Sequence, residues 1–283
     1  MLYFTVPVAF PGLITGSIVG LGEGWEAIVG AEIIGVTPGA AVTVKNLSPT
    51  FVGEDGKKTE ALRDVSFSVR SGEFFTILGP SGCGKSTLLR IIAGMARPSH
   101  GDISFADPKM EKRMSMIFQS FAIFPWLTVY ENVDFGLKMN GMPESERAPI
   151  VHEHIEEMAL TGFEKSYPKD LSGGMRQRVG IARALSMNPS ILLMDEAFSS
   201  LDAFTAERLR KDLLALWLKD RMTIIMVTHL VDEAIEMSDR ILVMTPRPGM
   251  VEATVEISLA RSRDKRSKEF FGLVDRVNEL VKI

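Results

Sequence analysis

A run of nine residues in the first third of the chain has the types and spacing of a phosphate-binding loop. Its glycines, Lys85 and Ser86 fit the pattern G-x-x-x-x-G-K-S. The glycines permit a tight turn that aims backbone N–H groups at phosphate oxygens, Lys85 would reach the β- and γ-phosphates of a nucleotide, and Ser86 would bind Mg²⁺. The predicted phosphate-binding residues are Gly79, Pro80, Ser81, Gly82, Cys83, Gly84, Lys85, Ser86 and Thr87.

The segments on either side of this loop support that interpretation. The apolar run over residues 74–78 is typical of a buried strand, and a helix is expected to open at Thr87. The positive end of that helix would face the same anion. The alternative is a glycine-rich turn without a ligand, but such a turn does not require a strand before it and a helix after it.

Two adjacent carboxylates follow a second apolar run. Residues 191–194 have the pattern of a buried strand that ends in Asp195 and Glu196. Ligands of open α/β sheets bind at the carboxyl ends of the strands, so Asp195 would hold Mg²⁺ through water, and Glu196 would be the general base for an attacking water molecule. A strand followed by an acidic helix cap is the alternative.

His229 follows a third apolar run, over residues 223–227. This position would place it beside the two carboxylates, where it could contact the γ-phosphate. A single histidine at the end of a strand is more often structural than catalytic, so its assignment depends on its neighbours.

The remaining patterns predict the scaffold that must position these residues. Two alternating stretches around the turn-forming residues 53–56 predict an antiparallel strand pair before the loop. Short apolar strands that alternate with helix-length segments predict a mostly parallel sheet covered by helices, an α/β fold. Residues from about 129 to 187 have helical periodicity and predict an inserted helical subdomain. The predicted strands are 42–47, 62–69, 74–78, 102–105, 114–118, 191–194, 223–227 and 241–244.

Composition limits the class of protein. The 283 residues carry a formal net charge of −4, which gives no basic surface for nucleic acid. A single cysteine excludes an internal disulfide and favours a reducing, cytoplasmic compartment. Glu23, Glu26 and Glu32 interrupt the most apolar stretch, so the uncharged run of roughly 18 residues that a membrane span needs is missing. The first basic residue is Lys45, which argues against a signal peptide.

Residues 171–178, with the sequence LSGGMRQR, resemble the signature motif of the ATP-binding cassette (ABC) family. Together with Gln119, residues 199–202 and His229 they complete the ordered motif set of that family, and the resemblance covers about residues 41–250. It implies a phosphate-loop NTPase fold with a mostly parallel sheet, an antiparallel β subdomain and an inserted helical subdomain. The expected ATPase domain spans 41–260, with the helical subdomain at about 128–189.

The resemblance also implies how nucleotide is held. In the family, two copies pair head to tail, and the phosphate-binding loop of one and the signature of the other close over the same ATP. Gln119 would then couple Mg²⁺ to a flexible segment, and Asp202 would line the dimer interface. Departures from the family pattern are Met175, where glutamine is commonest, and Phe51, where the adenine-stacking residue is usually tyrosine. The further nucleotide-binding residues implied are Phe51, Ser172, Gly173, Gly174 and Asp202.

Residues 119–133 and 194–202 are similar to the ATPase subunits of nitrate, sulfonate and taurine importers. This implies hydrolysis of ATP at the cytoplasmic face of the membrane, a permease partner, and an extracytoplasmic solute-binding protein that acts through the permease. Phe121, Phe124 and Trp126 would form a groove for a permease helix or pack in the core. The alternatives are a soluble ABC-type ATPase acting on nucleic acid or ribosomes, and a phosphate-loop kinase, which would lack the signature and His229.

Both ends of the chain differ from the ATPase domain. Residues 1–40 resemble the part of nitrate- and taurine-type permeases that follows their docking helix, and a disordered apolar leader is the alternative. Residues 261–283 are expected to form a charged C-terminal helix. Its basic residues would form a solvated face or, alternatively, contact lipid headgroups. These residues are Arg261, Arg263, Lys265, Arg266 and Lys268.

Overall fold

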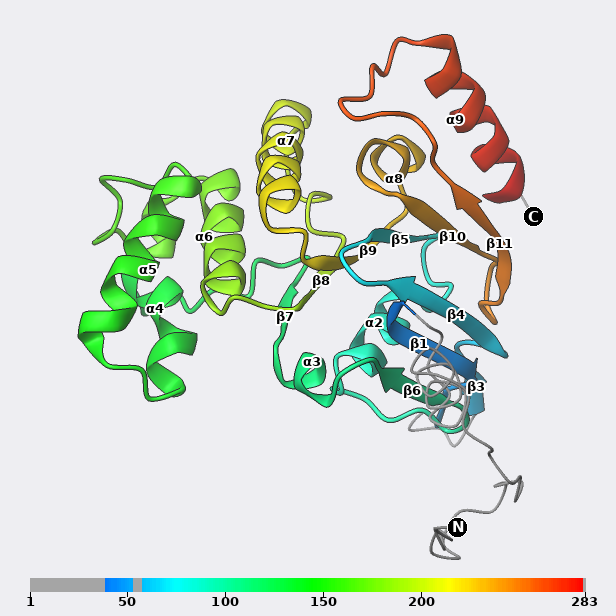
Figure 1. Cartoon of the computed structure of the whole chain (residues 1–283), viewed down its shortest axis with the longest axis horizontal. Helices are drawn as coiled ribbons and strands as arrows, with labels where there is room; N and C mark the ends of the chain where they lie inside the picture. Colours follow the sequence, from blue (N-terminus) through cyan, green and yellow to red (C-terminus); the bar gives the residue numbers. More distant parts are fainter. Residues whose placement is uncertain (1–38, 53–57, 282–283) are drawn as a thin grey trace, which may run out of the picture.

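The computed structural model describes residues 39–52 and 58–281 (Figure 1). The segment that resembles a permease lies outside the described residues except for Gly39 and Ala40, and so does the turn expected at 53–56.

A six-stranded sheet forms the centre of the molecule (Figure 1). Its strands, in spatial order, are β11 (Val251–Glu256), β10 (Arg240–Met244), β5 (Phe74–Leu78), β9 (Thr223–Thr228), β8 (Ile191–Asp195) and β7 (Met114–Ile117). The pairs from β10 to β7 are parallel, and β11 is antiparallel at one edge. β5, β8 and β9 are buried along their whole length because layers cover both faces of the sheet. The predicted mostly parallel sheet is therefore confirmed.

A second, antiparallel sheet has the order β4 (Val65–Arg70), β1 (Ala40–Leu47) and β6 (Asp102–Phe105). The predicted antiparallel pair before the loop is β1 with β4. Sequence reasoning missed the short strands β2 (Thr50–Val52) and β3 (Lys58–Glu60), which pair with each other. It also missed β11, whose half-exposed edge position gives no apolar run.

Hydrophobic cores lie on both faces of the central sheet. On one face, α2 (Lys85–Ile92) and the antiparallel sheet pack against β5, where Phe75 stacks on Phe67 with ring centroids 5.4 Å apart. On the other face, α7 (Ala203–Asp220) covers the sheet, and Trp217 meets Phe74 edge to face at 5.8 Å. Phe74 and Phe75 point to opposite faces because side chains alternate along a strand.

Three helices form a group beside the sheet, drawn in green in Figure 1. They are α4 (Val129–Met139), α5 (Glu144–Glu157) and α6 (Gly173–Ser186), and they pack against one another. Thr128 and Glu131 start α4 with a reciprocal capping box. These helices lie within the range expected for the helical subdomain. The shorter helices are α3 (Pro108–Lys112), η1 (Pro168–Asp170) and α8 (Val231–Met237).

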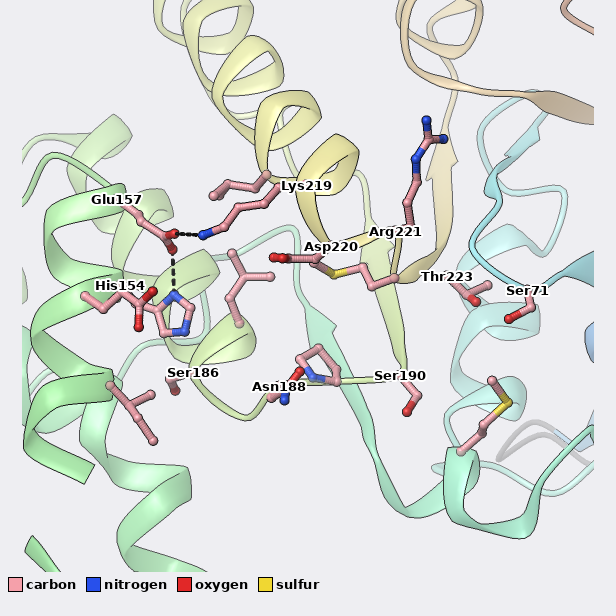
Figure 2. Close-up of a pocket in the computed structure, with 17 residues that line it drawn as sticks. Ser71, His154, Glu157, Ser186, Asn188, Ser190, Lys219, Asp220, Arg221 and Thr223 are labelled. Carbon is pink, nitrogen blue, oxygen red and sulfur yellow. Dashed lines mark hydrogen bonds and ion pairs between the residues drawn. The ribbon is translucent and has the colours of Figure 1, made fainter. Parts of the chain in front are cut away.

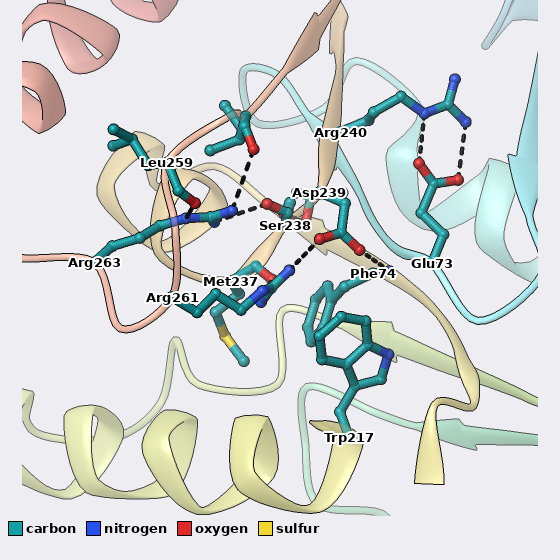
Figure 3. Close-up of polar contacts among 12 residues, drawn as sticks. Glu73, Phe74, Trp217, Met237, Ser238, Asp239, Arg240, Leu259, Arg261 and Arg263 are labelled. Carbon is teal, nitrogen blue, oxygen red and sulfur yellow. Dashed lines mark hydrogen bonds and ion pairs between the residues drawn. The ribbon is translucent and has the colours of Figure 1, made fainter. Parts of the chain in front are cut away.

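The charged stretch near the C-terminus is bound to the molecule, so the solvated face expected from the sequence is wrong for part of it (Figure 3). The last helix, α9, spans Lys268–Val281, and residues 261–267 precede it as a loop. Within this loop, Arg263 donates hydrogen bonds to the carbonyl oxygens of Ile235, Glu236 and Ser238, where α8 ends. The last carbonyls of a helix lack partners within the helix, so the guanidinium satisfies them. Burial lowers the pKa of Arg263 to about 10.

Arg261 and Lys265 are also held by the body of the molecule. Arg261 pairs with Asp239 at 2.6 Å, and its guanidinium lies 4.3 Å from the ring centroid of Trp217. Lys265 pairs with Glu236 at 2.7 Å. The sequence could not reveal these partners, because they come from the end of α8 and from α7. Of the five basic residues, only Arg266 and Lys268 are exposed as expected.

Candidate nucleotide-binding site

The predicted phosphate-binding loop connects β5 to α2 at the carboxyl edge of the parallel sheet. Gly84 forms the N-cap of α2 with φ 106°, and a Cβ there would lie 2.5 Å from Leu62 Cδ2 and 2.9 Å from the carbonyl oxygen of Ala61. Both the turn and this contact require glycine. The loop borders a pocket of about 370 Å³. The pocket is lined by Ala61, Ser81, Gly82, Gly84, Lys85, Ser86, Thr87, Gln119, Glu196 and Arg247.

Lys85 keeps its ammonium group inside the loop. The residue is only 4% exposed, and its Nζ donates to the carbonyl oxygens of Gly79 at 2.8 Å and Pro80 at 2.9 Å. A buried ammonium needs such partners, because burying an unpaired charge is costly. Nζ has three donors, so one remains for a ligand in the pocket.

Asp195 and Ser86 place two oxygen atoms together beside the loop. Asp195 ends β8 and is 5% exposed, and Ser86 Oγ donates to its Oδ1 at 2.7 Å. Burial raises the pKa of Asp195, and the hydrogen bond from Ser86 opposes that rise. Hydroxyl and carboxylate oxygens suit Mg²⁺, which commonly takes its remaining ligands from water and substrate phosphates. That fits a site with few protein ligands, since the described residues contain no cluster of three His, Cys, Asp or Glu that could hold a metal ion.

Glu196 lies at the centre of a second polar group. Its Oε2 accepts a hydrogen bond from Gln119 Nε2 at 3.2 Å and lies 3.4 Å from His229 Nδ1. Its backbone has φ 46°, a left-handed conformation that is uncommon for glutamate, and its N–H donates to Val227 O at 3.0 Å. The structure therefore brings together three predicted residues from the carboxyl ends of β7, β8 and β9.

Sequence reasoning missed the residues that hold the turn carrying His229. The hydroxyl of Thr228 donates to the buried carboxylate of Glu233 and accepts the N–H of Leu230 at 3.1 Å. Burial raises the pKa of Glu233. The only sequence signal is an acidic residue four positions after the histidine, at the start of α8.

The signature residues lie outside this pocket. Ser172 is the N-cap of α6 and accepts the N–H of Met175 at 3.2 Å, while Gly173 opens the helix. A Cβ at Gly174 would lie 2.5 Å from Thr205 Cγ2, so only glycine allows α6 to approach α7 this closely. The first turn of α7 is capped by Asp202, which accepts the N–H of Thr205 at 3.0 Å, and hydrogen bonds from Thr205 lower the pKa of Asp202.

Two further predicted residues stand apart from the pocket. The thiol of Cys83 points into the core below the loop, is 1% exposed, and has its pKa raised by burial. Only the backbone of Cys83 is therefore available to a nucleotide. Phe51 belongs to β2, where its backbone pairs with Thr59, and its side chain lies outside what the structure describes.

Arg247 was also missed, although it lines the pocket. It follows β10, the parallel neighbour of β5, within the turn Pro246–Gly249. A cation in a proline and glycine turn at the carboxyl edge of the sheet is the signal that could have identified it.

A larger hollow, of about 470 Å³, lies where α5 and α6 meet the end of α7 (Figure 2). Figure 2 shows that Glu157 binds both His154, at 2.9 Å, and Lys219, at 3.5 Å. None of the predicted site residues lines this hollow.

The comparisons with known proteins identify the family of this chain. Residues 62–199 match the family model described as ABC transporter. An uncharacterised ABC transporter ATP-binding protein of Methanocaldococcus jannaschii is 44% identical over 243 residues, which cover 84% of this chain and 90% of the relative. The chain belongs to the ABC transporter ATP-binding family. As a member, it binds ATP and hydrolyses it to power transport.

Other relatives carry more specific names. The aliphatic sulfonates import ATP-binding protein SsuB of Bacillus thuringiensis is 42% identical, with 83% of this chain and 94% of the relative covered. The nitrate import ATP-binding protein NrtD of Synechocystis is 38% identical, with 84% of this chain and 94% of the relative covered. A solved dimeric ATP-binding cassette in a post-hydrolysis state, bound to ADP and Pi, has a TM-score of 0.68 at 33% identity and covers 77% of this chain and 100% of its own. Within residues 39–52 and 58–281, no helix has the length and apolar character to cross a bilayer.

Proposed function

We propose that this ABC transporter ATP-binding protein powers the import of a small anion, with nitrate, aliphatic sulfonates and taurine as the candidate solutes. The relatives named SsuB and NrtD support the solute class. The single observation that carries the catalytic part is that one pocket is bordered by Lys85, Ser86 and Glu196, with Asp195 bonded to Ser86.

Each residue of the pocket has a role that its position supports. Lys85 donates its remaining N–H to oxygens of the β- and γ-phosphates, and backbone N–H groups of the loop bind the same phosphates. Mg²⁺ bound near Ser86, Asp195 and Gln119 would neutralise developing charge on the phosphates. Glu196 accepts a proton from the attacking water, Gln119 orients the carboxylate by its hydrogen bond, and His229 contacts the γ-phosphate.

A second copy of the chain would complete the site. Ser172 and Gly173 do not line the pocket of their own chain, yet Ser172 is exposed at the N-terminus of α6, with its O–H free to donate within the described residues. A helix N-terminus with a hydroxyl suits an anion. The dimeric form of the solved cassette supports head-to-tail pairing, in which Ser172, Gly173, Gly174 and Asp202 of one copy face the ATP of the other.

The surface near Gln119 would receive the permease at the cytoplasmic face of the membrane. Trp126 is 69% exposed and lies 5.6 Å from Phe124, which packs on Phe135 at 4.5 Å. Trp126 thus suits a docking groove, and the half-buried Phe124 supports it from below through its contact with Phe135. The solute would reach the permease from an extracytoplasmic binding protein.

The test is solute uptake in the source cell. Deleting the gene should abolish uptake of one labelled anion among nitrate, taurine and an alkanesulfonate. The wild-type gene should restore it, and Glu196→Gln should not. Unchanged uptake of all three anions, together with recovery of the protein in the ribosome fraction and not in membranes, would favour the alternative of a soluble ABC-type ATPase.

A further inference from the structure

Arg247 is a second cation of the nucleotide pocket that no motif explains. It lines the pocket with Ser81, Gly82 and Lys85. Lys85 is buried, whereas Arg247 is exposed. Its Nε donates to the carbonyl oxygen of Gly82 at 3.1 Å, the one hydrogen bond of its side chain within the part of the chain that the structure describes. A guanidinium has five N–H donors, so four remain available beside the loop.

The turn that carries Arg247 is fixed against the phosphate-binding loop. The N–H of Gly249 donates to Ala61 O at 3.0 Å, and the carbonyl of Gly249 accepts the N–H of Arg63 at 3.0 Å. A Cβ at Gly249 would lie 2.2 Å from Cys83 O, so only glycine permits this approach. These contacts fix the backbone of the turn, and so the starting point of the Arg247 side chain, beside the loop before any ligand arrives.

We propose that Arg247 contacts the nucleotide and binds its phosphates from the outer side of the loop, opposite Lys85. This inference rests on the pocket being the ATP site. Among the described residues that line the pocket, Lys85 and Arg247 are the two cations, and a pair of cations beside the loop suits a polyphosphate. The planar fork of a guanidinium can bind two phosphate oxygens at once, which an ammonium cannot do.

The test compares nucleotides that differ in their phosphates. Calorimetric titration of the full chain with ADP should show a loss of affinity of about tenfold or more for Arg247→Gln, as expected for a charge-assisted hydrogen bond. Affinity for adenosine should not change. Arg247→Lys should recover only part of the ADP affinity. Arg63→Gln is the matched control, because Arg63 lies beside the same turn but pairs with Glu60 outside the pocket, and it should bind ADP as wild type does.

Three results would overturn the proposal. ADP affinity could be unchanged in Arg247→Gln. ADP and adenosine affinity could fall together with the unfolding midpoint of the nucleotide-free chain, which would show that Arg247 only holds Gly82. ADP affinity could be retained while ATP-induced dimerisation is lost, which would assign Arg247 to the contact between copies. A wild-type chain that binds no ADP would instead refute the proposed ATP site.

Discussion

Replacing Gly84 by alanine tests whether contact with residues 61 and 62 fixes the phosphate-binding loop. Holding an alanine at positive φ lowers the free energy of unfolding by roughly 1–2 kcal/mol. Alanine also restricts the unfolded chain more than glycine does, which offsets about 0.4–1 kcal/mol of that loss. At Gly84 the new Cβ would also lie 2.5 Å from Leu62 Cδ2 and 2.9 Å from a backbone oxygen. Overpacking of this kind adds about 1–3 kcal/mol.

Gly94 provides the matched control at the other end of α2. Its φ is 70°, and a Cβ there would meet no atom within 4 Å, so Gly94→Ala carries the backbone cost alone. Urea unfolding of the nucleotide-free chain should therefore show Gly84→Ala to be about 1–3 kcal/mol less stable than Gly94→Ala. Equal losses in the two variants would refute the contact as the reason for glycine.

Three other substitutions or reactions probe the buried charges and the thiol. Arg263→Ala removes the donor to the carbonyl oxygens of Ile235, Glu236 and Ser238 and should lower the free energy of unfolding by about 2–4 kcal/mol. Arg266→Ala, whose side chain is exposed, should change it little. Burial raises the pKa of Asp195, so the protonated carboxyl stabilises the folded chain at low pH, and this stabilisation is lost as the pH rises through the raised pKa. Urea unfolding should therefore show that the free energy of unfolding of Asp195→Asn rises relative to that of wild type above about pH 4. Cys83 is buried with a raised pKa, so a thiol reagent followed by absorbance should react only as the chain unfolds, and rapid labelling of the folded chain would contradict the position of the thiol.

Strands β5, β8 and β9 of the central sheet were predictable because they are buried along their whole length and form uninterrupted apolar runs. The phosphate-binding loop and the carboxylates after β8 were predictable for a related reason, since their chemistry depends on residues adjacent in sequence. β11 was not predictable, because a half-exposed edge strand carries no such run, and β2 and β3 have only three residues each, too few for a periodic pattern.

Interactions between distant segments were also beyond the sequence. Arg263 was expected in solvent because it sits in a basic stretch, and nothing local shows that the end of α8 lies beside it. Arg247 enters the nucleotide pocket only because β10 is the neighbour of β5 in the sheet. Cys83 has the spacing of a loop residue, but the direction of its side chain is set by the core below it.

The most direct test of the central claim is turnover and binding in the Glu196→Gln variant. If Glu196 accepts the proton of the attacking water, ATP hydrolysis should fall by at least about a hundredfold, as expected for the loss of a general base. Binding of Mg-ATP should persist, and gel filtration with Mg-ATP should show a stable dimer, because two copies close over nucleotide that is not hydrolysed. Turnover close to that of wild type would remove Glu196 from the chemistry and contradict the proposed mechanism.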